Sequence, residues 1–222
     1  MTIKGAIFDM DGTLVDSLGF WSVFWKSFGE KYFNVSNFSP DTELDRKART
    51  TVFKGVIELI KEHYAMSESL EDLLDFGESV LYDFYRTKAT VKDGVFEFLE
   101  HLTNNGVKMC LASASNMSYI KAAFEATGLG KYFETVVSCA EVGKSKDHPD
   151  VFYRAAEILG EKIEDICVFE DSLVALQTAK NAGFLTVGVF DKNNYSQDKL
   201  QAASDIYLAE GMGMDKLIPL IN

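Results

Sequence analysis

The sequence predicts an α/β protein in which a doubly wound, Rossmann-like parallel sheet is interrupted after its first strand by an all-α insert. Three observations predict this class. From about residue 91 onward, a helical pattern ends at a glycine four times and a β-branched run follows each time, which is typical of βαβ units. An apolar run at 3–8 supplies one more strand at the start of the chain. Residues 15–88 lie between these two parts and show long amphipathic stretches without a convincing strand.

The expected elements of the sheet-forming part follow from apolar periodicity and from capping residues. Apolar residues at i, i+3, i+4 and i+7 from Val95 predict a helix, with Asp93 as its candidate N-cap and Asn105-Gly106 as its end. The later helices are expected to close at Gly128, Gly160 and Gly183. The expected strands lie at 3–8, 107–112, 135–138, 166–169 and 185–190.

The insert at 15–88 is predicted to be a separate helical domain, with 1–14 and 89–222 forming the α/β core. Apolar residues from Leu70 to Phe84 predict its last helix, with Ser67 as the candidate N-cap. Its first helix carries an aromatic stripe at helical spacing, most of which is expected to pack inside the insert. The stripe consists of Phe20, Trp21, Phe24, Trp25, Phe28, Tyr32 and Phe33.

Composition and charge exclude several classes of protein. The chain has 22 Lys and Arg against 34 Asp and Glu, a net charge of −12, so binding to nucleic-acid phosphates is unfavourable. It contains no apolar run of about 18 residues that could cross a membrane, and its opening apolar run is too short for a signal peptide. Three widely spaced cysteines, without a C-x-x-C pair, indicate neither disulfides nor a zinc site. We therefore expect a reduced, cytoplasmic enzyme or binding domain.

Four segments that carry polar chemistry each follow a predicted strand, at the end of a parallel sheet where ligands bind. The first is Asp9-Met10-Asp11-Gly12-Thr13. An acidic pair after a strand is also found in turns and helix caps, but the glycine permits a tight backbone turn beside a charged ligand. The full D-x-D-G-T pattern is therefore a specific signal of function.

The other three segments are ambiguous when each is taken alone. Ser113 and Ala114 lie at a strand-to-helix junction, which could be a helix cap or an anion site. Lys146 precedes a helix and could be an ordinary surface charge. Glu170 and Asp171 are adjacent carboxylates at a strand end, and such oxygen ligands suit Mg²⁺.

In this order, the four segments resemble the motifs of the haloacid dehalogenase (HAD) superfamily of phosphotransfer enzymes, over essentially the whole chain. The sequence is most similar to the subgroup that holds β-phosphoglucomutase and small sugar-phosphate phosphatases. The resemblance implies that the insert is the family's mobile, all-α cap and that the rest is its Rossmann-like core.

The resemblance also implies a role for each motif residue. Asp9 is implied as the nucleophile that forms an aspartyl-phosphate. Asp11 is implied as the general acid for the leaving oxygen and then as the base toward water. Lys146 is implied to offset negative charge, while Ser113 and the Ala114 N–H bind a phosphoryl oxygen.

The cofactor that the resemblance implies is Mg²⁺, because a cation must offset the repulsion between the acids and an incoming phosphate. Glu170 is expected either as a direct ligand or as an outer-shell acceptor. The implied metal-binding residues are Asp9, Asp11 through its backbone carbonyl, Asp171 and Glu170.

Two departures from the subgroup affect the details. Lys146 is followed by Asp147-His148-Pro149 where the subgroup usually has proline directly, so Lys144 is an alternative cation. Lys146 is favoured because it keeps the usual distance to the Pro-Asp that opens the next helix. Trp21 stands where the phosphoglucomutases carry a histidine, which argues against mutase activity and makes Trp21 a candidate substrate contact.

The mutases also carry an arginine-containing cap loop, which has no evident counterpart in this chain. The insert does contain a basic cluster, formed by Arg46, Lys47 and Arg49. We interpret this cluster as the solvated face of a helix.

The leading functional hypothesis is a Mg²⁺-dependent phosphatase that hydrolyses a small phosphorylated metabolite, with sugar phosphates favoured. The alternative enzyme is a phosphomutase of the β-phosphoglucomutase type. A distant alternative is a phospho-accepting signalling module such as a receiver domain, which would need little over half this length and no cap. The expected partners are a small phosphorylated metabolite, no nucleic acid and no membrane, with a monomer or weak homodimer as the assembly.

Overall fold

The computed structural model describes residues 1–48, 53–194 and 196–221. The chain divides into two compact units. One unit combines Met1–Leu18 with Ala89–Asn222, and the other is Gly19–Lys88. The second unit is thus inserted into the sequence of the first, and each is described below by itself.

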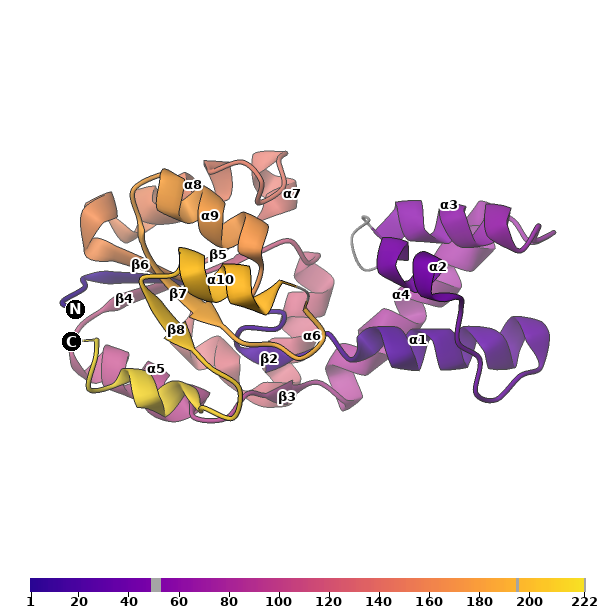
Figure 1. Ribbon diagram of the computed structural model, residues 1–222, viewed down its shortest axis with the longest axis horizontal. Helices are drawn as coiled ribbons and strands as arrows, with labels where there is room; N and C mark the ends of the chain where they lie inside the picture. The colour runs from indigo at the N-terminus through magenta and orange to yellow at the C-terminus, as the bar shows by residue number, and fades with distance from the viewer. Residues whose placement is uncertain (49–52, 195, 222) are drawn as a thin grey trace. The chain divides into compact units, whose positions relative to one another are not determined.

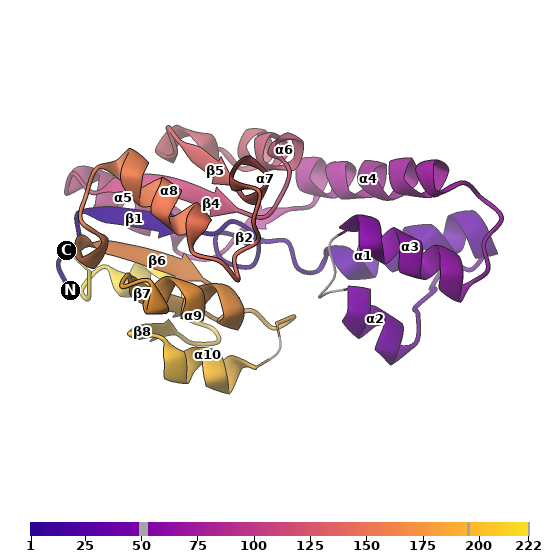
Figure 2. The ribbon, with the colours of Figure 1, turned by 90° about the horizontal axis from the view of Figure 1, so that it is seen from above.

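The first unit is built on a six-stranded sheet whose neighbouring strands are all parallel. Its strand order is β5-β4-β1-β6-β7-β8, which Figure 2 shows from β5 at the top to β8 at the bottom. The strands are β1 (Gly5–Phe8), β4 (Lys108–Ser113), β5 (Val136–Ser138), β6 (Ile166–Glu170), β7 (Leu185–Val189) and β8 (Ile206–Leu208).

Helices cover both faces of this sheet, with α5 and α6 on one side and α8 and α9 on the other (Figure 1). The predicted doubly wound α/β class is therefore confirmed. The helices of the first unit are α5 (Val95–Asn104), α6 (Met117–Thr127), α7 (Cys139–Val142), α8 (Asp150–Leu159), α9 (Leu173–Asn181) and α10 (Gln197–Ala203), with short turns η2 (Leu129–Tyr132), η3 (Ile163–Asp165) and η4 (Met214–Leu217).

The central strands are buried because both of their faces are covered by helices. Every residue of β1 and β6 is buried. At the ends of these strands, the rings of Phe8 and Phe169 stack with centroids 4.3 Å apart, and the two residues are register partners. The residues that follow them, Asp9 and Glu170, therefore emerge side by side at the carboxyl edge of the sheet.

The ends of several elements differ from the sequence-based expectation. Helix α5 has Gly94 as its N-cap, in the left-handed conformation, rather than Asp93. Strand β8 and helix α10 were not expected at all, and they extend the sheet beyond β7. Strand β2 (Val15–Asp16) pairs antiparallel with β3 (Thr90–Val91), so the expectation that 15–88 holds no strand is wrong at its first two residues.

Within its described residues, the second unit contains helices only: α1 (Phe20–Phe28), the π-helical turn η1 (Gly29–Phe33), α2 (Thr42–Ala48), α3 (Phe53–His63) and α4 (Leu70–Thr87). Its core is aromatic, because Phe24 contacts the rings of Phe20, Trp25 and Phe28 from its own helix and that of Phe53 from α3.

Two further expectations concern this second unit. The N-cap of α4 is Ser69, whose hydroxyl accepts the Asp72 N–H at 3.0 Å, rather than Ser67. Arg49, part of the predicted basic cluster, lies outside the described residues. No helix in the described parts of either unit is both long and apolar enough to cross a membrane.

Candidate active site

Three buried carboxylates gather where β1 and β6 end. Asp9 directly follows β1, and its backbone N–H donates to the Phe169 carbonyl at 3.0 Å. Glu170 is the last residue of β6, and Asp171 comes next. One carboxylate oxygen from each of Asp9, Glu170 and Asp171 lies within 4.8 Å of the others. The register of two adjacent parallel strands thus brings together acids that are about 160 residues apart in sequence.

One ammonium group enters this acidic cluster. The Nζ of Lys146 donates to Asp9 Oδ1 and, at 2.6 Å, to Glu170 Oε1. Its side chain is only 11% exposed. Lys144 instead forms an exposed pair with Asp150 at 2.9 Å. Of the two lysines left open by the sequence, Lys146 is therefore the one that lies at the acids.

The surplus of negative charge in the cluster perturbs its carboxyl groups. Burial raises the pKa of Asp9 to about 7, because the attraction of Lys146 only partly offsets the loss of solvation. Burial, together with the charges of Asp9 and Glu170, also raises the pKa of Asp171. Burial opposes the charge of Lys146, but the two adjacent carboxylates outweigh it and raise the pKa of that ammonium.

The donor set of this cluster fits Mg²⁺. Within the described residues, Lys146 is the only cation that forms an ion pair with these three carboxylates, so negative charge remains in excess and the site favours an additional cation. Mg²⁺ is a hard cation that takes oxygen ligands and is commonly bound by one or two carboxylates. Asp9, Asp171 and Glu170 present such oxygens close together.

The carboxylate of Asp11 lies outside this group of three and is held by two hydroxyls. Ser17 Oγ donates to Asp11 Oδ1 at 2.6 Å, and Ser115 Oγ donates to Asp11 Oδ2 at 2.7 Å. Gly12 follows with φ +85°, and an added Cβ there would overlap the Asp171 carboxylate. The glycine of the D-x-D-G-T pattern is therefore required both by its backbone conformation and by close packing.

The remaining predicted site residues lie in different settings. Ser113 ends β4, is fully buried, and accepts the Ser115 N–H at 3.0 Å. Ala114 is exposed at the start of the next loop. Trp21 belongs to α1 of the second unit, where it is partly exposed and packs edge-on against Phe24. The roles implied for these three residues stay predictions.

Three residues that the sequence did not single out surround the same loops. Lys92 Nζ donates to the Gly12 carbonyl, to the Phe190 carbonyl at 2.8 Å and to Asp191 Oδ2 at 3.0 Å. The Asn194 amide donates to Asp171. Asp191 follows a predicted strand, so the strand-end rule could have found it; Lys92 and Asn194 carry no comparable signal.

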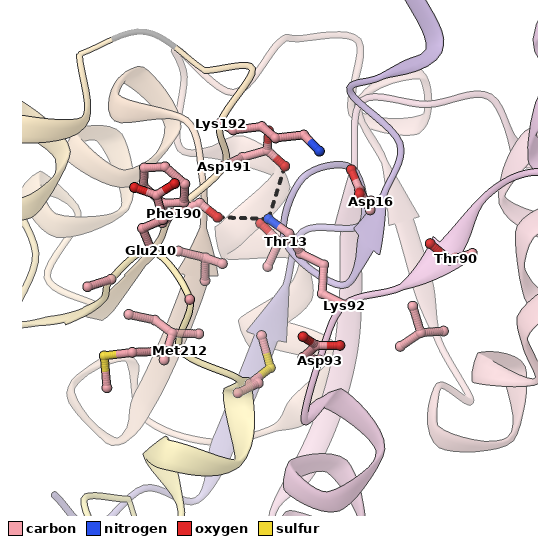
Figure 3. Close-up of a pocket in the computed structure, with 16 residues that line it drawn as sticks. Thr13, Asp16, Thr90, Lys92, Asp93, Phe190, Asp191, Lys192, Glu210 and Met212 are labelled. Atoms are coloured by element: carbon pink, nitrogen blue, oxygen red, sulfur yellow. Dashed lines mark hydrogen bonds and ion pairs between the residues drawn. The ribbon is translucent and has the colours of Figure 1, made fainter.

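Lys92 and Asp191 also line a cavity of about 460 Å³ within the first unit. Figure 3 shows the Lys92 ammonium between Thr13, Asp191 and the Phe190 carbonyl.

Comparisons with known proteins agree with this fold and identify the family. A family described as haloacid dehalogenase-like hydrolase matches residues 3–183. The chain is 26% identical over 204 residues to a "Phosphorylated carbohydrates phosphatase" of Thermotoga maritima, covering 91% of this chain and 92% of that protein. It is 26% identical over 207 residues to "Beta-phosphoglucomutase" of Bacillus subtilis, covering 84% and 83%.

A solved structure of the CbbY protein from Rhodobacter sphaeroides, in complex with phosphate, has a similar fold with a TM-score of 0.78. That match has 20% identity and covers 97% of this chain and 96% of the other. The chain belongs to the haloacid dehalogenase-like hydrolase family. The family and the class of enzyme expected from the sequence are thereby confirmed.

Proposed function

We propose that this hydrolase is a Mg²⁺-dependent phosphatase that cleaves the phosphomonoester of a small metabolite, with sugar phosphates as the favoured class. The observation that carries the proposal is the setting of Asp9. Its carboxylate is buried at the end of the central strand, contacts Lys146, and lies with Glu170 and Asp171 in one acidic cluster. A carboxylate fixed in this way is suited to attack phosphorus, because phosphoryl transfer depends mainly on positioning and charge stabilisation.

The first chemical step forms a bond between the Asp9 carboxylate and phosphorus and breaks the bond from phosphorus to the leaving oxygen. Asp11 gives its proton to that oxygen, so that the product alcohol leaves neutral. Ser17 and Ser115 hold the Asp11 carboxylate in place through their hydroxyl groups. Lys146 offsets part of the charge on the phosphoryl oxygens.

The second step returns the protein to its starting state. Asp11, now ionised, takes a proton from a water molecule that attacks phosphorus, and the bond from Asp9 to phosphorus breaks. Inorganic phosphate is released and the Asp9 carboxylate is restored. Ser113 and the Ala114 N–H are proposed to bind a phosphoryl oxygen in both steps.

The residues proposed to hold Mg²⁺ are Asp9, Asp171 and the backbone carbonyl of Asp11, with Glu170 as a ligand or outer-shell acceptor. When bound, the metal supplies positive charge that offsets the repulsion between the carboxylates and the phosphate.

A relative that is 26% identical across nearly the whole chain is named as a phosphatase of phosphorylated carbohydrates, which supports a phosphatase. What favours a phosphatase over a mutase is Trp21, because its side chain lacks the acid–base group that the mutases carry there. Phosphomutase activity is the second candidate, because the B. subtilis β-phosphoglucomutase has the same identity to this chain. The cytoplasmic location and the monomeric or weakly dimeric assembly stay predictions.

The experiment that tests the proposal is a phosphate-release screen with Mg²⁺ over sugar, polyol and nucleotide phosphates, using wild type and Asp9→Asn in parallel. The panel includes β-glucose 1-phosphate, with a coupled measurement of glucose 6-phosphate. We expect phosphate release that is absent in the variant. Formation of glucose 6-phosphate without phosphate release would contradict the phosphatase proposal and support phosphomutase activity instead.

A further inference from the structure

We propose that Asn194 is a positioning residue that fixes the Asp171 carboxylate for Mg²⁺ binding, within a turn that Asp191 and Lys92 hold in place. This inference rests on the proposed function, because it concerns a residue proposed to bind the metal there.

The contact between Asn194 and Asp171 is double. The Nδ2 of Asn194 donates to the main-chain carbonyl of Asp171 at 2.8 Å and to its Oδ2 at 2.6 Å. Both partners are acceptors, and only the amide nitrogen of asparagine can donate, so the orientation of the amide group is fixed. Because one nitrogen binds the backbone and the carboxylate of the same residue, it restricts rotation of the Asp171 side chain. Each carboxylate oxygen retains a further lone pair, which leaves Asp171 able to bind a cation.

Apart from this contact, the Asp171 carboxylate is held in place less firmly than those of the other two acids. Asp9 and Glu170 share the ammonium of Lys146. Within the described part of the chain, Asp171 forms no ion pair of that kind, and its other oxygen accepts only a long bond of 3.4 Å from the Thr13 hydroxyl. Asn194 therefore supplies the shortest side-chain hydrogen bond that orients the Asp171 carboxylate.

The turn that carries Asn194 is itself anchored. The Asn194 N–H donates to the Asp191 carbonyl at 3.0 Å. Asp191 Oδ1 accepts the Asn193 N–H at 2.8 Å, and Asp191 Oδ2 accepts from Lys92 at 3.0 Å. The Asp191 side chain is 2% exposed and that of Lys92 is 20% exposed. Breaking a buried pair of this kind leaves an uncompensated charge, so the turn is held firmly.

Lys92 links this turn to the loop that carries the catalytic acids. Its ammonium group also donates to the Gly12 carbonyl, between Asp11 and Thr13, and its backbone N–H donates to the Leu14 carbonyl at 2.9 Å. Figure 3 shows this ammonium bonded to both Asp191 and the Phe190 carbonyl. The two loops that flank the acidic cluster are thereby tied to one another within the first unit.

The test is a calorimetric titration of the full-length, metal-free protein with MgCl₂, comparing wild type with Asn194→Ala. We expect the Mg²⁺ dissociation constant of the variant to rise about tenfold or more, the usual effect of removing a group that orients a metal ligand. The matched control is Asn105→Ala, at the end of α5, where the side-chain amide donates to the His101 carbonyl at 2.8 Å and contacts neither Asp171 nor the turn that carries Asn194. We expect this control to bind Mg²⁺ as the wild type does.

Thermal unfolding in EDTA separates positioning from simple support of the fold. A lower melting temperature for Asn194→Ala with an unchanged Mg²⁺ dissociation constant would overturn the inference while leaving the proposed function intact. Failure of the wild type to bind Mg²⁺ would overturn the proposed function and this inference together. Should Asn194→Ala not fold, Asn194→Ser serves for the same titration with the same expected weakening.

Discussion

Replacing Asp9 with asparagine is expected to abolish turnover and, at the same time, to stabilise the metal-free fold. The amide has the shape of the carboxyl group but can neither attack phosphorus nor carry a charge. Burial raises the pKa of Asp9 from its ordinary value of 3.8 to about 7, and this is already the net result after the attraction of Lys146. The folded protein therefore resists ionisation of this group, and the variant escapes that penalty.

The size and the pH range of the effect follow from the two pKa values. A carboxyl group whose pKa is raised on folding contributes its full stability below pH 3.8, and this contribution is lost as the pH rises to about 7. One pKa unit corresponds to about 1.4 kcal/mol, so the loss is at most about 4 kcal/mol. The Asp9→Asn variant has no ionisable group at this position, so it does not lose stability in this way. Its advantage in free energy of unfolding should be near zero at about pH 4 and should grow with pH, up to at most about 4 kcal/mol at pH 8.

The assay is urea unfolding of both proteins in EDTA over this pH range, with the difference in free energy plotted against pH. Asp150→Asn is the control. The hydrogen bond from Lys144 lowers the pKa of the Asp150 carboxyl group, so replacing this carboxylate with an amide should not stabilise the fold. Addition of Mg²⁺ should stabilise the wild type and so reduce the difference in free energy of unfolding between the two proteins. An Asp9→Asn protein no more stable than the wild type at pH 8 would show that burial does not penalise the ionised Asp9 carboxylate.

Three other predictions follow from the same geometry. Lys146→Met should lower kcat about a hundredfold or more, because a charge that faces the phosphoryl oxygens is lost, whereas Lys144→Met should change kcat little. Gly12→Ala should weaken Mg²⁺ binding and turnover, since φ is +85° and a Cβ would overlap Asp171. Gly19→Ala, with open space around its Cβ, is the matched control. EDTA should stop phosphate release and added Mg²⁺ should restore it.

Each of these predictions has a contrary outcome. Equal losses in the two lysine variants would place the catalytic cation elsewhere. Normal Mg²⁺ binding by Gly12→Ala would show that the loop adjusts without disturbing Asp171. Full activity in EDTA would show that phosphate release does not require Mg²⁺.

The elements best predicted from the sequence are those with a strong internal pattern. The apolar spacing from Val95 and the closing glycines at 128 and 160 locate α5, α6 and α8 within a residue or two. Buried parallel strands are continuous apolar runs, which makes β4 and β6 equally visible. Because such strands end at one edge of the sheet, the sequence also indicated which acids would meet.

The elements that were missed lack such a pattern. Strand β8 has three residues at the edge of the sheet, too short for any periodicity to show. Ser67 and Ser69 are both capping residue types two positions apart, and the choice of Ser69 depends on its hydrogen bond to Asp72. Lys92 and Asn194 reach the site only through turn geometry and long-range contacts, and no local spacing encodes those.

The proposed reaction requires that Asp9 is transiently phosphorylated, and this acyl phosphate can be trapped chemically. The enzyme is mixed with substrate and Mg²⁺, quenched in acid and treated with borohydride, which reduces an aspartyl-phosphate to homoserine. Peptide mass spectrometry then locates the modified residue. We expect homoserine at position 9, dependent on both substrate and Mg²⁺. Modification at another residue, or none while phosphate is released, would contradict the phosphorylation of Asp9.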